Sequence, residues 1–196
     1  MPRIFYMPRT RSSRVLWALY EIGAAFDATR IAPEERRSAE HLARQPLGRV
    51  PALELDDGTM MFESAAILLA LGDLHPQSGL LPGIGTPQRA LVYQWMFFGM
   101  TELEATLYRS MREPAEALPE NREFRRFTDA ATAFSNALGE GPWILGAKFT
   151  LADIVCVGVL GSADSRGLLA VWPGLSDYVA RGEARPAYAA AVSFGE

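Results

Sequence analysis

The sequence predicts an α/β domain followed by an all-α domain. Strand-like and helix-like segments alternate through residues 1–75, and no persuasive strand pattern follows them. Between Pro76 and Pro87 the chain collects three prolines and three glycines, which is typical of a linker. We therefore expect an α/β domain over 1–75, a linker over 76–86 and a helical domain over 87–196.

The composition is that of an ordinary globular protein, with 49% hydrophobic and 21% charged residues over 196 positions. The formal net charge of −4 argues against a nucleic-acid partner, which would favour a basic face. No apolar run reaches membrane-spanning length, so we expect no membrane segment. His41 and His75 are far apart and lack zinc-site spacing, so we expect no metal.

The single cysteine, Cys156, lies in an apolar run and has no partner for a disulfide within the chain. This suits a reducing compartment, and we expect a cytoplasmic protein. An apolar setting also raises the pKa of a thiol, so Cys156 is a poor candidate for a nucleophile.

The first domain opens with a strand, a helix and a second strand. Arg3 to Met7 has the apolar character of a buried strand, and the spacing of Ser12 to Ile22 predicts a helix. Gly23 then suits the residue after a helix end, and Phe26 to Ile31 predicts the second strand. Strands joined by a helix in this way should be parallel. Ser38 can cap a short helix that ends at Arg44.

A hairpin and another helix complete this domain. Val50-Pro51 stands at the entry to an apolar strand, which suits proline and also a cis peptide in a tight turn. Asp57-Gly58 predicts a type I′ hairpin turn. The second strand ends at Phe62, and Ser64 is a natural N-cap for the helix that follows. The open N-terminus of that helix would attract a carboxylate.

The second domain reads as helices throughout. Thr86-Pro87 supplies a cap and a first-turn proline for a helix to Met111, which carries more apolar residues than one buried face requires. Glu120 to Leu138 predicts a further helix. Thr150 and Asp153 form a capping box, which we assign to folding. Two short helices should begin at Trp172-Pro173 and at Arg185-Pro186.

One stretch also resembles a known family. In order and spacing, three motifs are similar to the glutathione-binding half of a cytosolic glutathione S-transferase: Val50-Pro51-Ala52-Leu53, Asp57-Gly58 and Glu63-Ser64-Ala65-Ala66-Ile67. The resemblance covers nearly the whole chain and implies a thioredoxin-like first domain. It implies that glutathione is a co-substrate whose cysteine pairs with the Val50 backbone beside cis-Pro51. It also assigns Arg49 to this site and gives the γ-glutamyl end to Glu63 and Ser64.

Conjugation of glutathione needs a thiolate, whereas a free thiol has a pKa near 8.5. A donor hydroxyl, a cation and a helix N-terminus each favour the charged form, and residues 8–14 offer all three. The resemblance to theta- and delta-like classes places their catalytic serine at Thr10, with Arg11 and Ser12 assisting. The cysteine of the bacterial beta class falls on Arg11, and Tyr6 is a weaker candidate for the tyrosine of other classes.

The family resemblance further implies an electrophile pocket and a homodimer. The pocket should be lined by Met7, Arg9, Met100 and Tyr108 together with the C-terminal helices. We expect the helix from Pro87 to Met111, with its excess of apolar residues, and the helix from Ala65 to Asp73 to meet across the two-fold axis of this dimer.

Two other functions fit the same motifs. A glutathione-dependent isomerase of the zeta type would share the fold, but the Ser-Ser-Cys signature of that class is missing from residues 8–14. A binding or regulatory module without turnover would also keep Glu63-Ser64. Retention on immobilised glutathione without turnover of chlorodinitrobenzene would distinguish such a module.

Overall fold

The computed structural model describes residues 1–195, without the side chains of residues 115 and 116. The chain divides into two compact units. The first comprises Met1–Gly79 and the segment from Arg185 onward, and the second comprises Leu80–Ala184. Among the described residues, no helix has the length and the hydropathy needed to cross a bilayer.

The first unit contains a four-stranded sheet in the order β2-β1-β3-β4. Its strands are β1 (Arg3–Tyr6), β2 (Asp27–Arg30), β3 (Ala52–Glu54) and β4 (Met60–Phe62). The parallel pairing of β1 with β2 confirms the strand–helix–strand prediction, whereas β3 is antiparallel to both β1 and β4. This mixed sheet confirms the predicted α/β domain of thioredoxin-like type.

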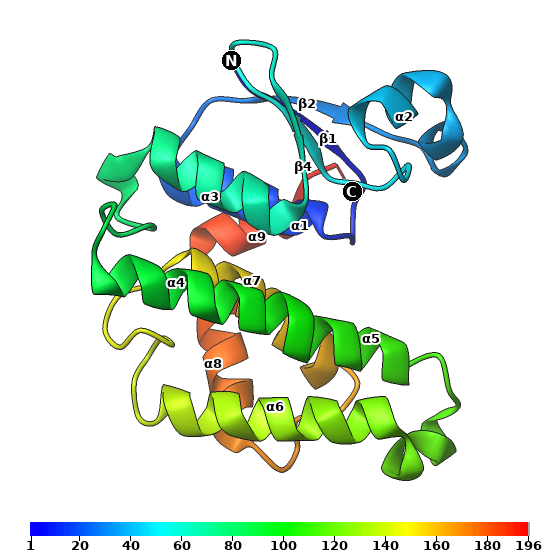
Figure 1. Cartoon of the computed structure of the whole chain (residues 1–196), viewed down its shortest axis with the longest axis vertical. Helices are drawn as coiled ribbons and strands as arrows, with labels where there is room; N and C mark the ends of the chain where they lie inside the picture. The colour runs from blue at the N-terminus through cyan, green and yellow to red at the C-terminus, as the bar shows by residue number, and fades with distance from the viewer. Residues whose placement is uncertain (196) are drawn as a thin grey trace. The chain divides into compact units, whose positions relative to one another are not determined.

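Helices cover the sheet because β1 is apolar toward both faces. Helices α1 (Ser12–Ile22) and α3 (Ser64–Leu74) run side by side (Figure 1). The short α2 (Ala39–Arg44) begins at the predicted Ser38 cap. The Arg44 guanidinium of α2 lies 4.2 Å from the ring centre of Phe5, so α2 covers the face onto which Phe5 points. A 3-10 turn, η1 (Pro33–Arg37), precedes α2.

The hairpin between β3 and β4 differs from the prediction. A type I′ turn needs positive φ at both central residues, but in the Asp57-Gly58 pair only Gly58 has one, at +83°. Leu55 accepts a hydrogen bond from the Gly58 N–H and donates one to the Thr59 carbonyl, each 2.9 Å long. The Asp57 carboxylate accepts from the Thr59 N–H at 2.9 Å, which lowers the pKa of Asp57. The type I′ prediction is therefore wrong, because the Asp57 side chain stabilises a longer turn.

The C-terminal helix α9 (Pro186–Ser193) belongs to the first unit, whereas the sequence placed it with the helical domain. Trp17 of α1 meets Tyr188 edge to face at 5.0 Å. Arg185 donates to both carboxylate oxygens of Glu21, at 2.5 and 2.7 Å. These contacts fix the end of the chain against α1.

The second unit is helical, as predicted. Its elements are α4 (Pro87–Phe98), η3 (Gly99–Glu104), α5 (Ala105–Ser110), η4 (Ala115–Glu120), α6 (Arg122–Leu138), α7 (Leu151–Asp164) and α8 (Pro173–Glu183). The predicted single helix to Met111 is interrupted by η3, a π-helical turn. The hydroxyls of Thr101 and Thr106 donate to the carbonyls of Phe97 and Glu102, and such back-bonding competes with the helical ladder.

A buried carboxylate anchors α7. Asp153 accepts hydrogen bonds from the N–H of Thr150 at 2.8 Å, from the N–H of Ile144 at 3.0 Å and from the Tyr178 hydroxyl at 2.8 Å. Burial raises the pKa of Asp153 even though these bonds oppose the shift. The reach of Asp153 back to Thr150 is the contact expected from a capping box.

Candidate functional site

Strand register brings three predicted segments to one edge of the first unit. Ala52 of β3 lies opposite Phe5 of β1 and opposite Phe62 of β4. The chain before Ala52 therefore runs beside the chain after Phe62 and beside the loop that follows β1. This places Val50-Pro51, Glu63-Ser64 and the 7–12 loop together.

The turn before β3 is held by side chains that sequence reasoning missed. The buried Gln45 accepts from the N–H groups of Leu47 and Arg49, at 2.7 and 2.9 Å. His41, also buried, lies with its Nε2 2.9 Å from the Arg49 carbonyl, and because a carbonyl only accepts, the imidazole donates. The sequence signal for these two residues is weak, because His41 is a single polar residue inside a short helix and Gln45 stands at its end.

The peptide bond between Val50 and Pro51 is cis, which confirms the prediction made for this turn. Pro51 is buried and Val50 is half-buried, while Arg49 is exposed. Val50 also packs against the cluster of Phe5, Ile31 and Ala52. Packing and the hydrogen bonds of the preceding turn thus fix the backbone at Val50.

Ser64 is the first residue of α3 and not its N-cap, which corrects the prediction. The cap position is Glu63, and its side chain makes no capping hydrogen bond. Glu63 has φ +71° and ψ 110°, a conformation that costs about 1–3 kcal/mol for a residue other than glycine. The strained Glu63 turns the chain sharply from β4 into α3.

The hydroxyl of Ser64 is buried and has no hydrogen-bond partner among the described residues. Such an unsatisfied group costs about 1–3 kcal/mol. The first N–H groups of α3 lie beside it, because the ladder of this helix starts only with the bond from Ile67 to Glu63. A carboxylate of a ligand would satisfy these donors together, so the residues present fit an anionic group here.

The loop after β1 binds its own hydroxyl groups. Thr10 donates to the Met7 carbonyl at 2.7 Å and accepts from the Ser12 N–H at 3.2 Å. The two hydroxyl oxygens lie 3.0 Å apart, so with the Thr10 hydrogen on Met7, Ser12 is the donor between them. Ser12 is buried, and its oxygen also accepts from the Met7 N–H at 3.4 Å. To donate a hydrogen bond to a ligand, either hydroxyl would first have to break one of these bonds.

The arginines of this loop have distinct positions. Arg9 is exposed and has φ +57°, a strained conformation for this residue. Arg11 is exposed at the N-cap of α1, with no side-chain capping bond. Both guanidinium groups belong to the loop at the N-terminus of α1, whose first N–H groups donate to Thr10 and Arg11 of the same loop.

The four residues predicted for an electrophile pocket come from both units. Met7 and Arg9 belong to the first unit. In the second, Met100 is half-buried in η3, and Tyr108 is 40% exposed with its hydroxyl 3.4 Å from that of Ser162. The pocket itself stays a prediction. Within the described part of the chain, no three His, Cys, Asp or Glu side chains are grouped as a metal would require.

Comparisons with known proteins match both parts of the chain. The model of the glutathione S-transferase N-terminal domain matches residues 10–74, and that of the C-terminal domain matches residues 119–181. Glutathione S-transferase GstA of Escherichia coli O157:H7 is 31% identical over 163 residues, covering 81% of this chain and 80% of that protein.

Solved structures agree with this match. A glutathione transferase from Methylococcus capsulatus str. Bath has a TM-score of 0.87 and 31% identity, covering 98% of this chain and 97% of its own. A sphingomonad glutathione S-transferase complexed with glutathione has a TM-score of 0.84 and 30% identity, covering 97% and 96%.

Gly48 should be essential to the turn that carries Val50. Its φ is +62°, and a Cβ there would lie 2.3 Å from the Arg36 carbonyl oxygen. Gly48→Ala should therefore lower the free energy of unfolding by about 1–3 kcal/mol more than Gly58→Ala. At Gly58, φ is +83° and no atom lies within 4 Å of such a Cβ, so Gly58→Ala has only the cost of the unfavourable backbone conformation. Equal losses in urea unfolding of the two variants would contradict the contact with Arg36.

Proposed function

Because the chain belongs to the glutathione S-transferase family, we propose that it binds glutathione and activates the glutathione thiol as a thiolate. The thiolate sulfur attacks an electrophilic carbon of a small hydrophobic compound, and the leaving group departs with its electron pair. The observation that carries the proposal is the buried Ser64 hydroxyl without a protein partner among the described residues, at the open N-terminus of α3.

The γ-glutamyl end of glutathione has the charges that this corner accepts. Its carboxylate would take the Ser64 hydroxyl and the first N–H groups of α3, where the helix dipole favours negative charge. Its ammonium would pair with Glu63, which is exposed. The similar sphingomonad transferase is complexed with glutathione, which supports glutathione itself as the ligand.

The cysteine of glutathione would bind along the backbone of Val50, with Arg49 beside it. The fixed turn from Gln45 to Pro51 keeps that backbone in place before the ligand arrives, which reduces the entropy lost on binding. The sulfur would then lie near the 7–12 loop and the N-terminus of α1.

We propose Thr10 as the donor that stabilises the thiolate, with Arg11 and Ser12 assisting. Thr10 reaches the sulfur by exchanging its bond to the Met7 carbonyl for one to the thiolate. Ser12 supports Thr10 through the contact between their hydroxyls. Arg11 and the helix N-terminus add positive potential, which favours the charged form of the thiol.

The electrophile would occupy a pocket formed by Met7, Arg9, Met100 and Tyr108. These side chains are apolar, aromatic or long, which suits a hydrophobic substrate with one polar group. We place this detoxifying role in the cytoplasm, where reducing conditions suit the buried free thiol of Cys156.

A non-catalytic glutathione-binding protein is the second candidate. The observation in its favour is the 2.7 Å bond from Thr10 to Met7, which occupies the hydroxyl that catalysis would use. Retention on immobilised glutathione without conjugation of chlorodinitrobenzene would select this function over the transferase.

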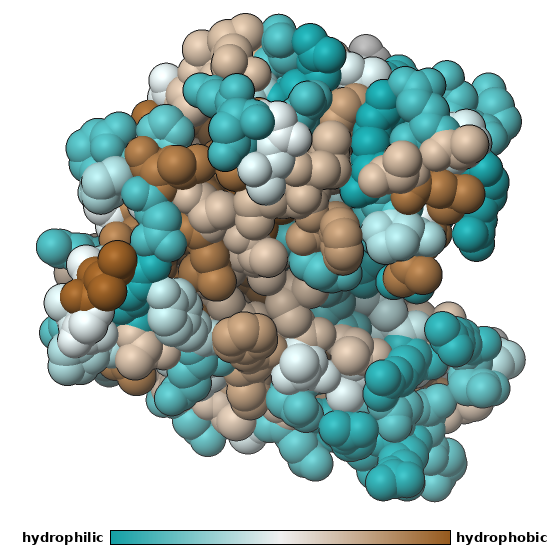
Figure 2. Space-filling view, turned by 45° about the horizontal axis from the view of Figure 1, so that its top comes forward, coloured by the Kyte–Doolittle hydropathy of each residue, from teal (hydrophilic) through white to brown (hydrophobic). Residues whose placement is uncertain are grey.

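We also propose a homodimer. The exposed face of α4 includes Leu91 and Phe97, which are 43% and 60% exposed. In the first unit, Phe62 of β4 is 42% exposed. Figure 2 shows hydrophobic groups gathered in patches on the displayed face. A second copy of the chain would cover such surfaces across a two-fold axis.

Ser64→Ala should weaken glutathione binding roughly tenfold to a hundredfold. The variant removes one charge-assisted hydrogen bond to the γ-glutamyl carboxylate, worth about 1.5–3 kcal/mol. Titration calorimetry measures the affinity, and Ser78→Ala, a half-buried serine beyond the far end of α3, is the matched control. If Ser64→Ala binds as the parent does, Ser64 has only a structural role.

Thr10→Val should raise the pKa of the bound glutathione thiol by about one to two units, because it removes one hydrogen bond to the thiolate. Glutathione affinity should change little, since binding rests on the other segments. The thiolate absorbance is titrated against pH in Thr10→Val and in Ser12→Ala. A shift in Ser12→Ala alone would transfer the role to Ser12.

In solution the protein should have twice the chain mass of 21.5 kDa. Phe97→Asp should reduce it to the monomer mass, because a charge would be buried in the apolar interface. Val171→Asp, at a site 74% exposed in the second unit, should stay dimeric. Sedimentation at micromolar concentration measures the mass in solution, and a monomeric parent protein would exclude the dimer.

A further inference from the structure

The peptide group between Arg49 and Val50 lies directly before the cis bond of the candidate site. This peptide is trans, because the one cis bond among the described residues joins Val50 to Pro51. In a planar trans peptide the carbonyl and the N–H point in opposite directions. A side chain that holds the Arg49 carbonyl therefore also sets the direction of the Val50 N–H.

The His41 imidazole holds that carbonyl. Its Nε2 lies 2.9 Å from the Arg49 oxygen, and because a carbonyl only accepts, the ring proton is on Nε2. His41 is fully buried, its N–H donates to the Ser38 hydroxyl at 3.1 Å, and its carbonyl accepts from the Gln45 N–H at 2.9 Å. The ring thus belongs to a fixed part of α2, and the Val50 N–H points away from it.

Other side chains hold the preceding peptide group. Arg36 donates from Nε to the Gly48 carbonyl at 2.9 Å, and Gln45 accepts from the Arg49 N–H at 2.9 Å. Both contacts act on the plane between Gly48 and Arg49, and not on the plane that follows it. Within the described part of the chain, the imidazole makes the single hydrogen bond to that following plane.

Packing of the Val50 side chain does not replace this bond. Val50 packs against Phe5, Ile31 and Ala52, which fixes the position of its side chain and Cα. A peptide plane can still rotate about the line between two fixed Cα atoms, through opposite changes of ψ in one residue and φ in the next. Such a rotation would turn the Val50 N–H toward the N–H of His41, and two donors do not bond to each other. The imidazole proton therefore selects one orientation of the plane.

We propose that His41 is a positioning residue of the glutathione site, which holds the Arg49 carbonyl and so presents the Val50 N–H to the carbonyl of the glutathione cysteine. The Val50 N–H has no hydrogen-bond partner among the described residues, and Val50 is only half-buried. This role rests on the proposed function, because glutathione brings the acceptor. His41 acts on the ligand through the backbone and touches no ligand atom itself.

Two peptides that differ by one carboxamide test this role. γ-Glutamylcysteinamide has the cysteine carbonyl and γ-glutamylcysteamine lacks it, while both keep the thiol and the γ-glutamyl end. Calorimetry on the parent protein should show roughly three- to tenfold tighter binding of the cysteinamide, which is the effect of one neutral hydrogen bond. Equal binding of the two peptides would overturn the proposal and leave recognition of the γ-glutamyl end in place.

Variants of His41 locate the origin of the preference. His41→Phe keeps a ring but removes the donor, so it should bind the two peptides about equally. His41→Gln returns a donor nitrogen the same number of bonds from Cβ as Nε2, and it should restore the preference. Partial unfolding weakens the apparent affinity for both peptides by the same factor, so lost stability alone leaves their ratio unchanged. An unchanged preference in His41→Phe would contradict the role.

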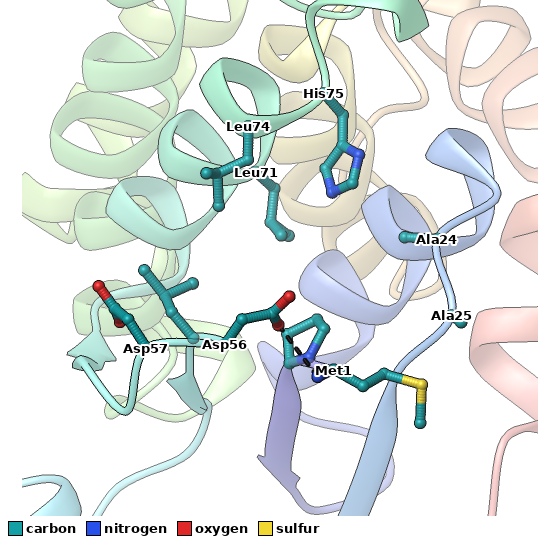
Figure 3. Close-up of a pocket in the computed structure, with 10 residues that line it drawn as sticks. Met1, Ala24, Ala25, Asp56, Asp57, Leu71, Leu74 and His75 are labelled. Atoms are coloured by element: carbon teal, nitrogen blue, oxygen red, sulfur yellow. Dashed lines mark ion pairs between the residues drawn. The ribbon is translucent and has the colours of Figure 1, made fainter.

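The matched control is His75, the other histidine of the chain. It follows α3 at the end far from Ser64, where it lines a separate cavity together with Met1 and Asp56 (Figure 3). His75→Phe should keep the preference of the parent protein for the cysteinamide. Loss of the preference in this variant would contradict the assignment to His41.

The orientation of the plane can also be tested without a ligand. In the free parent protein, ¹⁵N relaxation should give the Val50 amide an order parameter of about 0.85, the value of rigid backbone, and His41→Phe should lower it. A mobile Val50 amide in the parent, or an unchanged value in His41→Phe, would overturn the proposal. If neither peptide binds the parent, the proposed function fails, and the order of the Val50 amide still decides whether His41 holds this peptide group.

Discussion

The candidate site depends on the pairing of three strands at one edge of the sheet. Ala52 faces Phe5 on one side and Phe62 on the other, so Val50-Pro51 and Glu63-Ser64 have to meet beside the loop after β1. A slip of one residue would turn the buried Leu53 outward, because side chains alternate between the faces of a strand. Burial of the apolar side chains therefore fixes the strand register, and the register in turn fixes the relative positions of the site residues.

Two locally unfavourable features are maintained at this edge. Glu63 has a positive φ, and the Ser64 hydroxyl is buried without a partner among the described residues, each at a cost of about 1–3 kcal/mol. The buried packing of α3 keeps the backbone at Glu63 and Ser64 in this arrangement, while the bonds of Gln45 and His41 hold the neighbouring turn before Val50. Local strain of this kind is typical of a binding site formed before its ligand arrives, and it agrees with the proposed capture of a carboxylate.

Local sequence patterns were sufficient for most of the fold, because helix spacing, caps and strand alternation act over a few residues. They predicted α1 at its observed bounds and the cis bond before Pro51. Local patterns failed where contacts between residues far apart in the sequence determine the structure. The helix α9 belongs to the first unit and not to the second, and Arg185 at its N-cap pairs with Glu21 of α1. In the site, the sequence predicted that Thr10 lies in the loop after β1. It did not predict the bond from Thr10 to the Met7 carbonyl, because that bond depends on the folded path of the loop.

We propose that the edge at Glu63-Ser64 recognises the α-carboxylate of the γ-glutamyl group. Calorimetry with glutathione and with 4-aminobutanoyl-Cys-Gly, which lacks that carboxylate, tests it most directly. The parent protein should bind glutathione roughly tenfold to a hundredfold more tightly than the analogue, which is the effect of one charge-assisted hydrogen bond or more. Equal affinity for the two peptides would contradict it.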